Sequence, residues 1–336
     1  MPKQALVLGG AGFVGTHLCA RLKRDGYWVR AVGIRDPRYK LDGVKCDEFI
    51  KGDLRSRDFC AQVFDRAYDE AYQLAADMGG AGYLFTGDND AAVMRNSALM
   101  NLEVMEQAQL SKCARLFFSS TACVYPRRNQ KNPADPLCAE NSVYPADPDS
   151  EYGWEKLFSE RAYMAFARNY GITVRIGRYH TSYGPNCTWR GGREKVIPAM
   201  CRKVAEAEDG GQIEIWGDGE QTRSFTFVDD TIEGTLRLTR SDCEVPLNIG
   251  SEEMVTINQL VDLICEIAGK RLTKRHIDGP LGVRGRNSDN ALIRERLKWE
   301  PSIDLRTGLA LTYRWIYDQV RAAGSGPANA IISSSS

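Results

Sequence analysis

A short apolar run, a glycine-rich turn and an amphipathic segment follow one another at the start of this chain. Residues 5–8 are apolar, residues 9–15 read GGAGFVG, and residues 16–25 are amphipathic. A strand, a tight glycine turn and a helix in this order are typical of dinucleotide-binding folds, because the glycines let the backbone approach a pyrophosphate at the helix N-terminus. An ordinary glycine-rich turn is the alternative. The order of the three elements favours a nucleotide-binding sheet built from this end of the chain.

Strand and helix patterns alternate along the first half of the chain. Further strands are expected at residues 28–32, 49–55, 71–76, 115–120 and 173–178, with long helices around 96–109 and 152–169. This alternation predicts an α/β protein with a Rossmann-type, doubly wound parallel sheet. After residue 178 the pattern loosens, and we expect helices at 197–208, 258–268 and 309–320 and short strands at 213–216 and 223–228.

The loosening suggests two domains, for which 336 residues provide ample core. We expect a nucleotide-binding Rossmann domain over residues 1–177 with about 217–245 added. A smaller α/β domain that binds the substrate would comprise residues 178–216 and 246–322. Residues 323–336 are small and serine-rich, which predicts a disordered tail.

Composition excludes several classes of partner. Lys+Arg and Asp+Glu both number 44, so no overall charge recruits nucleic acid or an anionic membrane. No apolar run is long enough to span a membrane, and no secretory signal precedes the first strand. The ten cysteines are scattered and only three histidines occur, which suits neither a zinc site nor a disulfide framework. We therefore expect a cytoplasmic enzyme with reduced cysteines and no metal.

The ends of the second and third strands bear on the choice of cofactor. An acidic residue commonly binds the adenosine ribose at the end of the second strand, but this chain has Gly33 there, with Arg35 two residues on. Arg35 tolerates a 2′-phosphate better than a carboxylate does, so NAD and NADP both stay open. Alternatively, Arg35 is solvated and Asp36 binds the ribose. Asp53 is placed either to accept a hydrogen bond from the adenine amino group or to cap the next helix.

Small residues end the fourth strand and allow a cofactor to approach closely. The segment 77–82 that follows is too rich in glycine for a helix and predicts a loop over the ligand. The expected cofactor-binding residues come from the glycine turn, from the ends of strands two to four and from a later helix. They are Gly9, Gly12, Phe13, Val14, Gly15, Gly33, Arg35, Asp53, Leu54, Leu74, Ala75, Ala76, Tyr152 and Lys156.

Tyr152 and Lys156 lie four residues apart in an expected helix, and therefore on the same face one turn from each other. An ammonium in that position would favour the phenolate and lower a pKa that is about 10 when unperturbed. Beside a hydroxyl donor such as Thr121, the phenolate is a base for a sugar or alcohol hydroxyl. On its own this spacing is a weak signal, since both residues are common on helices.

Taken in order, these motifs resemble the extended short-chain dehydrogenase/reductase family of nucleotide-sugar enzymes over nearly the whole chain. The resemblance is carried by the glycine turn and by the segments 52–54, 74–76, 119–121, 152–156 and 183–185. Longer strings are similar to the members that epimerise GDP-mannose at C3 and C5. These strings are residues 74–80, 122–126, 188–195, 216–227 and 282–290.

This resemblance implies a hydride cycle on a GDP-sugar. Tyr152, assisted by Lys156 and Thr121, would deprotonate the C4 hydroxyl while tightly bound NAD accepts the hydride. The 4-ketone acidifies the hydrogens at C3 and C5, and Cys123 and Lys195 would form the acid–base pair that inverts those carbons. Return of the hydride would recycle NAD and convert GDP-D-mannose into GDP-L-galactose and GDP-L-gulose.

Substrate contacts are also implied by the resemblance, and arginines among them suit a diphosphate because a guanidinium forks onto phosphate oxygens. The implied residues are Gly79, Thr121, Ala122, Cys123, Thr181, Glu194, Lys195, Lys203, Gln221, Arg223 and Arg286. The family is usually homodimeric through helices near 96–110 and 152–170. Without the resemblance, Cys123 would be a small buried apolar residue. Lys195 and Lys203 would be solvated charges, and Arg223 and Arg286 would each pair with a nearby acid.

Three positions depart from the pattern of these enzymes. Gly33 replaces an Asp, Thr181 replaces an Asn, and Thr121 replaces a Ser while keeping the hydroxyl. The rival functions are a plain 4-epimerase, a dehydratase and a catalytically silent NAD(P)-binding scaffold. A 4-epimerase needs no second acid–base pair, and the dehydratases usually carry Asp and Glu where this chain has Ala122 and Cys123. Silent members typically lose the tyrosine or the lysine, and both are present here.

Overall fold

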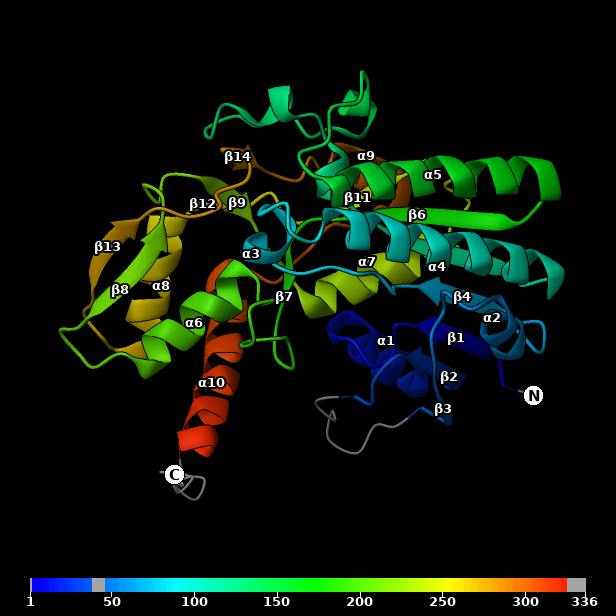
Figure 1. Ribbon diagram of the computed structural model, residues 1–336, viewed down its shortest axis with the longest axis horizontal. Helices are drawn as coiled ribbons and strands as arrows, with labels where there is room; N and C mark the ends of the chain where they lie inside the picture. Colours follow the sequence, from blue (N-terminus) through cyan, green and yellow to red (C-terminus); the bar gives the residue numbers. More distant parts are fainter. Residues whose placement is uncertain (1, 38–45, 325–336) are drawn as a thin grey trace, which may run out of the picture.

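A seven-stranded parallel sheet forms the centre of the computed structural model, which describes residues 2–37 and 46–324 (Figure 1). The strand order is β11-β6-β5-β4-β1-β2-β3. The strands are β1 Gln4–Leu8, β2 Trp28–Gly33, β3 Glu48–Lys51, β4 Glu70–Gln73, β5 Arg115–Thr121, β6 Thr173–Tyr179 and β11 Leu247–Ile249. Leu8 pairs with Val32 on one side and with Gln73 on the other. The predicted Rossmann-type sheet is confirmed.

Helices cover both faces of this sheet, and the side chains of β1 alternate between them. Ala5 and Val7 belong to the core under α1 Phe13–Arg24 and α7 Val228–Arg240. Leu6 and Leu8 belong to the core under the other layer, which contains α2 Arg57–Val63, α4 Asp90–Leu110 and α5 Glu151–Tyr170. A strand with apolar residues on both faces is the expected consequence of this burial.

The second part of the molecule is built from short strands and three packed helices, and lies on the left in Figure 1. The helices α6 Val196–Glu206, α8 Ile257–Ala268 and α10 Leu305–Gly324 contact one another. β8 Gln212–Trp216 pairs with β13 Thr273–Ile277, and β9 Thr222–Ser224 lies between β12 Met254–Thr256 and β14 Gly285–Arg286. β10 Thr226–Phe227 pairs with β7 Ser182–Tyr183.

The remaining short helices lie in the connections. They are α3 Ala81–Leu84, α9 Ala291–Leu297 and the 3₁₀ turns η1 Ala122–Val124, η2 Arg127–Gln130 and η3 Glu140–Val143. The expected loop at 77–82 is therefore wrong in its last two residues, which begin α3. Gly80 precedes this helix in an extended conformation, so Gly79 and Gly80 lie before α3, whereas Gly82 lies within it.

Two expected segments divide differently from the prediction. The expected strand at 223–228 is two short strands, because β9 joins β12 and β14 whereas β10 joins β7. β11 forms an edge of the large sheet, so the boundary expected at residue 245 leaves out a strand of that sheet. Three residues are too few to give a periodic signal.

The last helix extends into the segment expected to be a disordered tail. α10 continues to Gly324, so the first two residues of the expected tail are helical. Residues 325–336 of that tail lie outside the described part of the chain. Among the helices of residues 2–37 and 46–324, none combines the length and apolar character needed to cross a membrane.

Candidate functional site

The turn between β1 and α1 forms a compact cradle of backbone donors. Gly9 has φ +86°, and its N–H donates to Val32 O at 2.9 Å. A Cβ on Gly15 would lie 2.2 Å from Gly9 O, so the turn closes only with glycine there. Gly12 caps α1 without a side-chain hydrogen bond, which leaves N–H groups of the first helical turn free for an anion. The cradle fits the pyrophosphate of a dinucleotide.

Gly33 packs directly against this turn. A Cβ on Gly33 would lie 2.7 Å from the Cβ of Ala11, so any side chain at this position forces the turn to move. Arg35 is exposed, and the exposed Asp36 pairs with Lys51 at 2.8 Å. Asp36, whose carboxylate could bind the ribose in place of the acid that is absent at Gly33, is therefore paired with Lys51.

Asp53 follows the end of β3 by two residues and is held by Arg55. The backbone N–H and the guanidinium of Arg55 both donate to Asp53, and these hydrogen bonds lower the pKa of that carboxyl group. The N-cap of α2 is Ser56, whose hydroxyl accepts from Phe59 N at 3.3 Å. The alternative role of Asp53 as the helix cap is therefore wrong, and its role at the adenine stays a prediction.

The other expected cofactor residues lie around the same edge of the sheet. Leu54 is buried, and Leu74 N–H donates to Leu8 O at 3.0 Å. Ala75 lies so close to the glycine turn that a Cβ on Gly9 would be 2.8 Å from Ala75 N. The structure thus brings the ends of β1 and β4 together, and Ala76 follows directly on Ala75. The approach of a cofactor to these small residues stays a prediction.

Tyr152 and Lys156 are both buried on α5. Lys156 Nζ donates to Ser119 O at 2.9 Å and lies 5.9 Å from the centre of the Tyr152 ring. We expected this lysine to lower the pKa of the tyrosine. Burial instead raises the pKa of Tyr152 above its ordinary value, and it lowers the pKa of Lys156. The expectation was wrong because spacing gives the contact but not the desolvation of both groups.

Thr121 connects Tyr152 to Cys123. It ends β5, and its hydroxyl accepts a hydrogen bond from Cys123 N at 3.2 Å while favouring the ionised form of Tyr152. The start of α5 packs on this turn without a gap, since a Cβ on Gly153 would lie 2.3 Å from Cys123 O. The phenol and the thiol therefore lie in one buried site, with Ala122 buried between Thr121 and Cys123.

Arg286 lies beside the Cys123 thiol. Its Nη1 is 3.2 Å from Cys123 Sγ, its Nε donates to Gln130 Oε1 at 2.7 Å, and its Nη2 is 2.5 Å from Asp149 Oδ2. Burial is the main cause that raises the pKa of Cys123, Asp149 adds to it, and Arg286 opposes it. Arg286 therefore pairs with an acid, as the alternative interpretation expects. Its guanidinium also contacts the Cys123 thiol.

Lys195 reaches the site from the second part of the molecule, where it is the N-cap residue of α6. Burial lowers the pKa of its amine, and the charges of Cys123 and Cys187 oppose that effect. Glu194, which precedes Lys195 in the chain, and Gln221 each carry a buried acceptor atom, Oε2 and Oε1, that has no hydrogen-bond partner among the described residues. Unpaired buried acceptors are costly, so they fit a ligand that brings N–H or O–H groups.

The remaining predicted substrate residues differ in the contacts that they make within the protein. Within the described part of the chain, Arg223 donates to the main-chain carbonyls of Thr222, Leu281 and Val283. Burial together with the charge of Arg286 lowers its pKa to about 10. Lys203 Nζ donates to Glu214 O at 2.8 Å. Thr181 O accepts from Thr226 N, and a Cβ on Gly79 would meet the Tyr83 side chain at 2.7 Å.

Two residues of the site were missed in the sequence. Asp149 and Gln130 hold the Arg286 guanidinium. Gln130 is buried, and so is the side chain of Asp149. Asp149 precedes Ser150, the N-cap of α5, so it resembles one more acid at a helix start. No local sequence pattern marks Gln130, because its hydrogen-bond partner Arg286 is 156 residues away along the chain.

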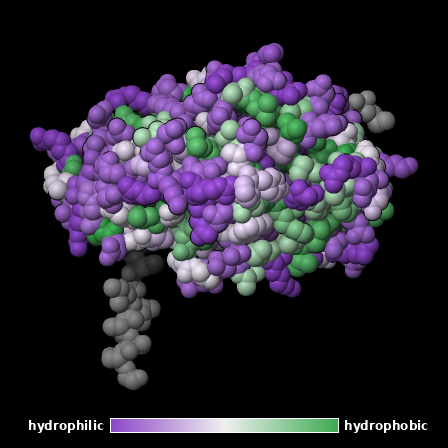
Figure 2. Space-filling view, turned by 90° about the horizontal axis from the view of Figure 1, so that it is seen from above, coloured by the Kyte–Doolittle hydropathy of each residue, from purple (hydrophilic) through white to green (hydrophobic). Residues whose placement is uncertain are grey.

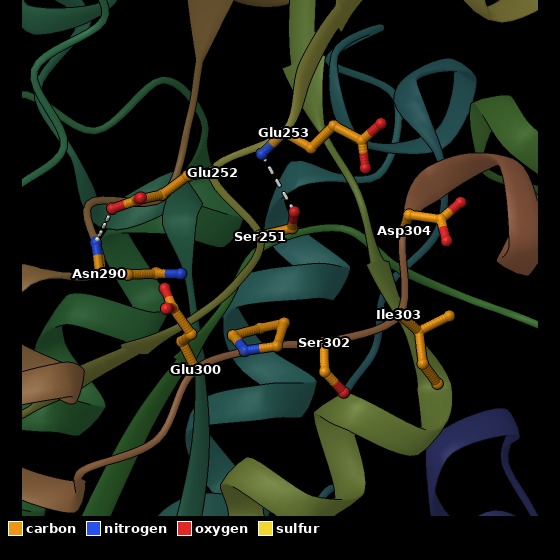
Figure 3. A pocket seen from close by; sticks show the side chains of 9 residues that line it. Ser251, Glu252, Glu253, Asn290, Glu300, Ser302, Ile303 and Asp304 are labelled. Atoms are coloured by element: carbon orange, nitrogen blue, oxygen red, sulfur yellow. Dashed lines mark hydrogen bonds between the residues drawn. The ribbon is translucent and has the colours of Figure 1, made fainter.

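A hollow elsewhere on the surface contains no predicted site residue (Figure 3). Its acids serve structural bonds: Glu252 accepts from Asn290 N at 2.8 Å and pairs with Arg294, and Glu253 accepts from Leu305 N at 2.7 Å. Across the described residues, no group of three or more His, Cys, Asp or Glu is arranged to hold a metal ion.

Comparison with known proteins gives the family. Residues 5–250 match the NAD dependent epimerase/dehydratase family. A GDP-mannose 3,5-epimerase of Arabidopsis thaliana is 42% identical over 322 residues, which are 95% of this chain and 84% of that protein. A UDP-glucose 4-epimerase from Thermotoga maritima, solved with UDP-glucose, superposes with a TM-score of 0.81 at 26% identity, covering 94% of this chain and 99% of that one.

A further solved structure contains the cofactor. It is a variant of UDP-glucuronic acid 4-epimerase from Bacillus cereus, in complex with UDP-4-deoxy-4-fluoro-glucuronic acid and NAD. It has a TM-score of 0.79 and 26% identity, covering 94% of this chain and 99% of that chain. Together with the glycine cradle and the buried Tyr152–Lys156 pair, these matches identify the chain as a member of the NAD dependent epimerase/dehydratase family.

Proposed function

We propose that this chain is a GDP-mannose 3,5-epimerase, which converts GDP-D-mannose into GDP-L-galactose and GDP-L-gulose. One observation carries the proposal: the buried site holds Tyr152 and also a second pair of proton-transfer groups, Cys123 and Lys195. The 42% identity to GDP-mannose 3,5-epimerase over 95% of this chain supports the same substrate.

Tyr152 takes the proton of the sugar C4 hydroxyl, and the Thr121 hydroxyl stabilises the phenolate that does so. NAD, when bound, supplies the hydride acceptor for C4, and its oxidised ring carries a positive charge that favours a neighbouring phenolate. The glycine cradle holds the pyrophosphate of the cofactor. Lys156 orients the site through its bond to Ser119 O.

Cys123 and Lys195 invert C3 and C5 of the 4-keto sugar. One group removes a proton from the carbon and the other returns a proton to the opposite face, which changes the configuration. Burial lowers the pKa of Lys195, which increases its neutral, basic form at neutral pH. Arg286 favours the thiolate of Cys123. A plain 4-epimerase has no use for this second pair.

The second part of the molecule holds the GDP group. Arg223, whose guanidinium has no carboxylate partner among the described hydrogen bonds, would bind the diphosphate, and Lys203 would add a charge. The buried acceptors of Glu194 and Gln221 would receive N–H or O–H groups of the ligand. In this division, residues 178–216 and 246–322 form most of the substrate domain, with β11 assigned to the cofactor domain.

The chain forms a homodimer through α4 and α5 in this proposal. Leu102 is 41% exposed on α4, and Trp154 and Phe158 are 40% and 50% exposed one turn apart on α5. Figure 2, viewed from the side of α4 and α5, shows hydrophobic surface gathered over this half of the molecule. An apolar face of this kind marks an interface. All ten cysteines are free thiols, which supports a reducing compartment such as the cytoplasm.

The test is incubation of the purified protein with GDP-mannose in deuterated water, followed by NMR of the sugar. The expected result is deuterium at C3 and C5 together with the galacto and gulo products. Epimerisation at C4 without solvent deuterium would replace this proposal with a plain 4-epimerase. Absence of any turnover of GDP-mannose would remove it and restore the silent binding scaffold.

A further inference from the structure

Two distant segments meet at the edge of the site. Residues 77–84 follow β4 and include α3, whereas residues 184–195 connect β7 to α6 (Figure 1). Gly80 N–H donates to Arg193 O at 3.1 Å. A Cβ on Gly80 would lie 2.1 Å from Glu194 O, so the two backbones touch with no room for a side chain.

The side chain of Arg193 completes this contact. Its Nη1 lies 3.1 Å from Asp77 Oδ1, its Nη2 donates to Tyr83 OH at 2.8 Å, and its guanidinium stacks 3.9 Å above the Tyr83 ring. Tyr83 OH in turn donates to Asp77 Oδ1 at 2.9 Å. These three side chains form a closed triangle, and we call Asp77, Tyr83 and Arg193 the clasp.

The clasp is anchored on the cofactor side of the molecule. Asp77 N–H donates to Ser97 Oγ at 3.1 Å, and Asp77 Oδ2 accepts from Asn96 Nδ2 at 2.8 Å. Both partners belong to the long helix α4. Asn96 Oδ1 also accepts from Arg55 Nη1 at 2.7 Å, and Arg55 holds Asp53. A chain of polar contacts therefore runs from the expected adenine contact to the clasp.

On the other side, the clasp holds the backbone that carries Lys195. Gly191 and Gly192 precede Arg193 with φ of +99° and +82°, and no atom of residues 2–37 and 46–324 lies within 4 Å of a Cβ placed on either. Such glycines leave the loop free to move. Lys195 follows Arg193 by two residues, so its backbone is fixed by the clasp before α6 begins.

We propose that Arg193 is a positioning residue for Lys195, and that the clasp fixes the Lys195 amine relative to Cys123 during inversion at C3 and C5. The proposal rests on the proposed function for its chemical consequence. Tyr152 lies on α5, and none of the three clasp residues belongs to that helix. Loss of the clasp therefore slows proton exchange at C3 and C5 more than oxidation at C4. A displacement of about 1 Å costs about 100-fold in rate.

The test compares Arg193→Met, which keeps an aliphatic side chain and loses the guanidinium, with Asp77→Asn and with the double variant. Arg190→Met is the matched control, because Arg190 is exposed in the same loop and stacks on Trp189. Two rates are measured with GDP-mannose. Solvent deuterium at C3 and C5 is followed by NMR, and the first oxidation is followed by the absorbance of reduced nicotinamide.

In Arg193→Met we expect exchange to fall about 100-fold while the oxidation rate stays within about threefold. The double variant should be no slower than Arg193→Met, because the two residues act as one unit. Equal losses in both rates would assign Arg193 a general structural role and overturn the proposal, as would an equal effect of Arg190→Met. If Arg193→Met does not fold, Arg193→Gln, which also removes the guanidinium and leaves the Asp77–Asn96 hydrogen bond in place, provides the same comparison.

A second measurement needs no substrate. Acetic anhydride labels only the neutral amine, so the pH midpoint of Lys195 labelling, read by peptide mass spectrometry, reports its environment. Loss of the clasp should expose the amine and raise this midpoint by about one pH unit toward the ordinary lysine value, with no change in Arg190→Met. A shift without turnover of GDP-mannose would refute the proposed function alone. Turnover without a shift, and with unchanged exchange in Arg193→Met, would refute the clasp alone.

Discussion

Arg286 Nη1 lies 3.2 Å from Cys123 Sγ, although the two residues are 163 positions apart in the chain. Asp149 accepts a hydrogen bond from the other terminal nitrogen of this guanidinium, Nη2. The thiol therefore lies in a buried environment that disfavours its charge, next to a cation that favours it. This balance makes the pKa of Cys123 adjustable in both directions by single substitutions around it.

Arg286→Gln should raise the pKa of Cys123 further, because the positive charge that opposes burial is removed. Asp149→Asn should lower it, because a negative charge that disfavours the thiolate is lost. The measurement is the pH midpoint of iodoacetamide labelling at Cys123, read on its own peptide because the chain has ten cysteines. Shifts of the same sign in both variants would contradict this account of the charges.

Lys195→Met should lower deuterium exchange at C3 and C5 by about 10²- to 10⁴-fold, the usual contribution of a general acid or base. Oxidation at C4 should persist, since Tyr152 and Lys156 are untouched. The measurement is NMR of GDP-mannose in deuterated water beside the absorbance of reduced nicotinamide. Lys274→Met, on the outer strand β13, serves as the control and should leave both rates unchanged. A variant that retains wild-type exchange would remove Lys195 from the chemistry.

Glu160→Gln should destabilise the fold strongly. Arg178 and Glu160 form an ion pair at 2.8 Å with side chains only 5% and 1% exposed, so the change leaves a buried guanidinium without its counter-charge. Breaking such a pair costs about 3 kcal/mol of unfolding free energy, measured by urea denaturation. Glu266→Gln breaks the pair with Arg306, whose side chains are both 59% exposed, and should leave stability within error. Equal effects would mean that burial does not decide the cost.

Gly33→Asp should weaken NAD binding despite restoring the acid common in relatives, because its Cβ would lie 2.7 Å from that of Ala11. The second change Ala11→Gly removes the obstructing methyl group and should recover affinity. Titration calorimetry with NAD, and in parallel with NADP, measures both effects. Tighter NAD binding by Gly33→Asp alone would indicate that the turn moves freely.

Much of the fold could be predicted from local sequence. The apolar runs at β1 and β5 and the glycine turn encode their own conformation, so the parallel sheet and its nucleotide edge followed directly. β11 has three residues and no periodic signal. The stretch 223–228 reads as one strand because alternation says nothing of partners, and two different sheets divide it.

The candidate site could likewise be predicted only in part. Spacing alone placed Tyr152 and Lys156 on one helix face, and the resemblance named Cys123, Lys195 and Arg286. The sequence did not reveal that Asp149 and Gln130 hold Arg286, or that Arg193 joins Asp77 across 116 residues. It also predicted a lowered pKa for Tyr152, whereas burial raises it.

The sequence by itself therefore determined the first six strands of the parallel sheet, the glycine cradle and the helix that carries Tyr152 and Lys156. The reason is that backbone conformation and apolar periodicity are properties of neighbouring residues. Only the tertiary structure decided which charges meet and how deeply they are buried. Desolvation and charge–charge contacts depend on residues distant in the chain, as the 163-residue separation of Cys123 and Arg286 illustrates.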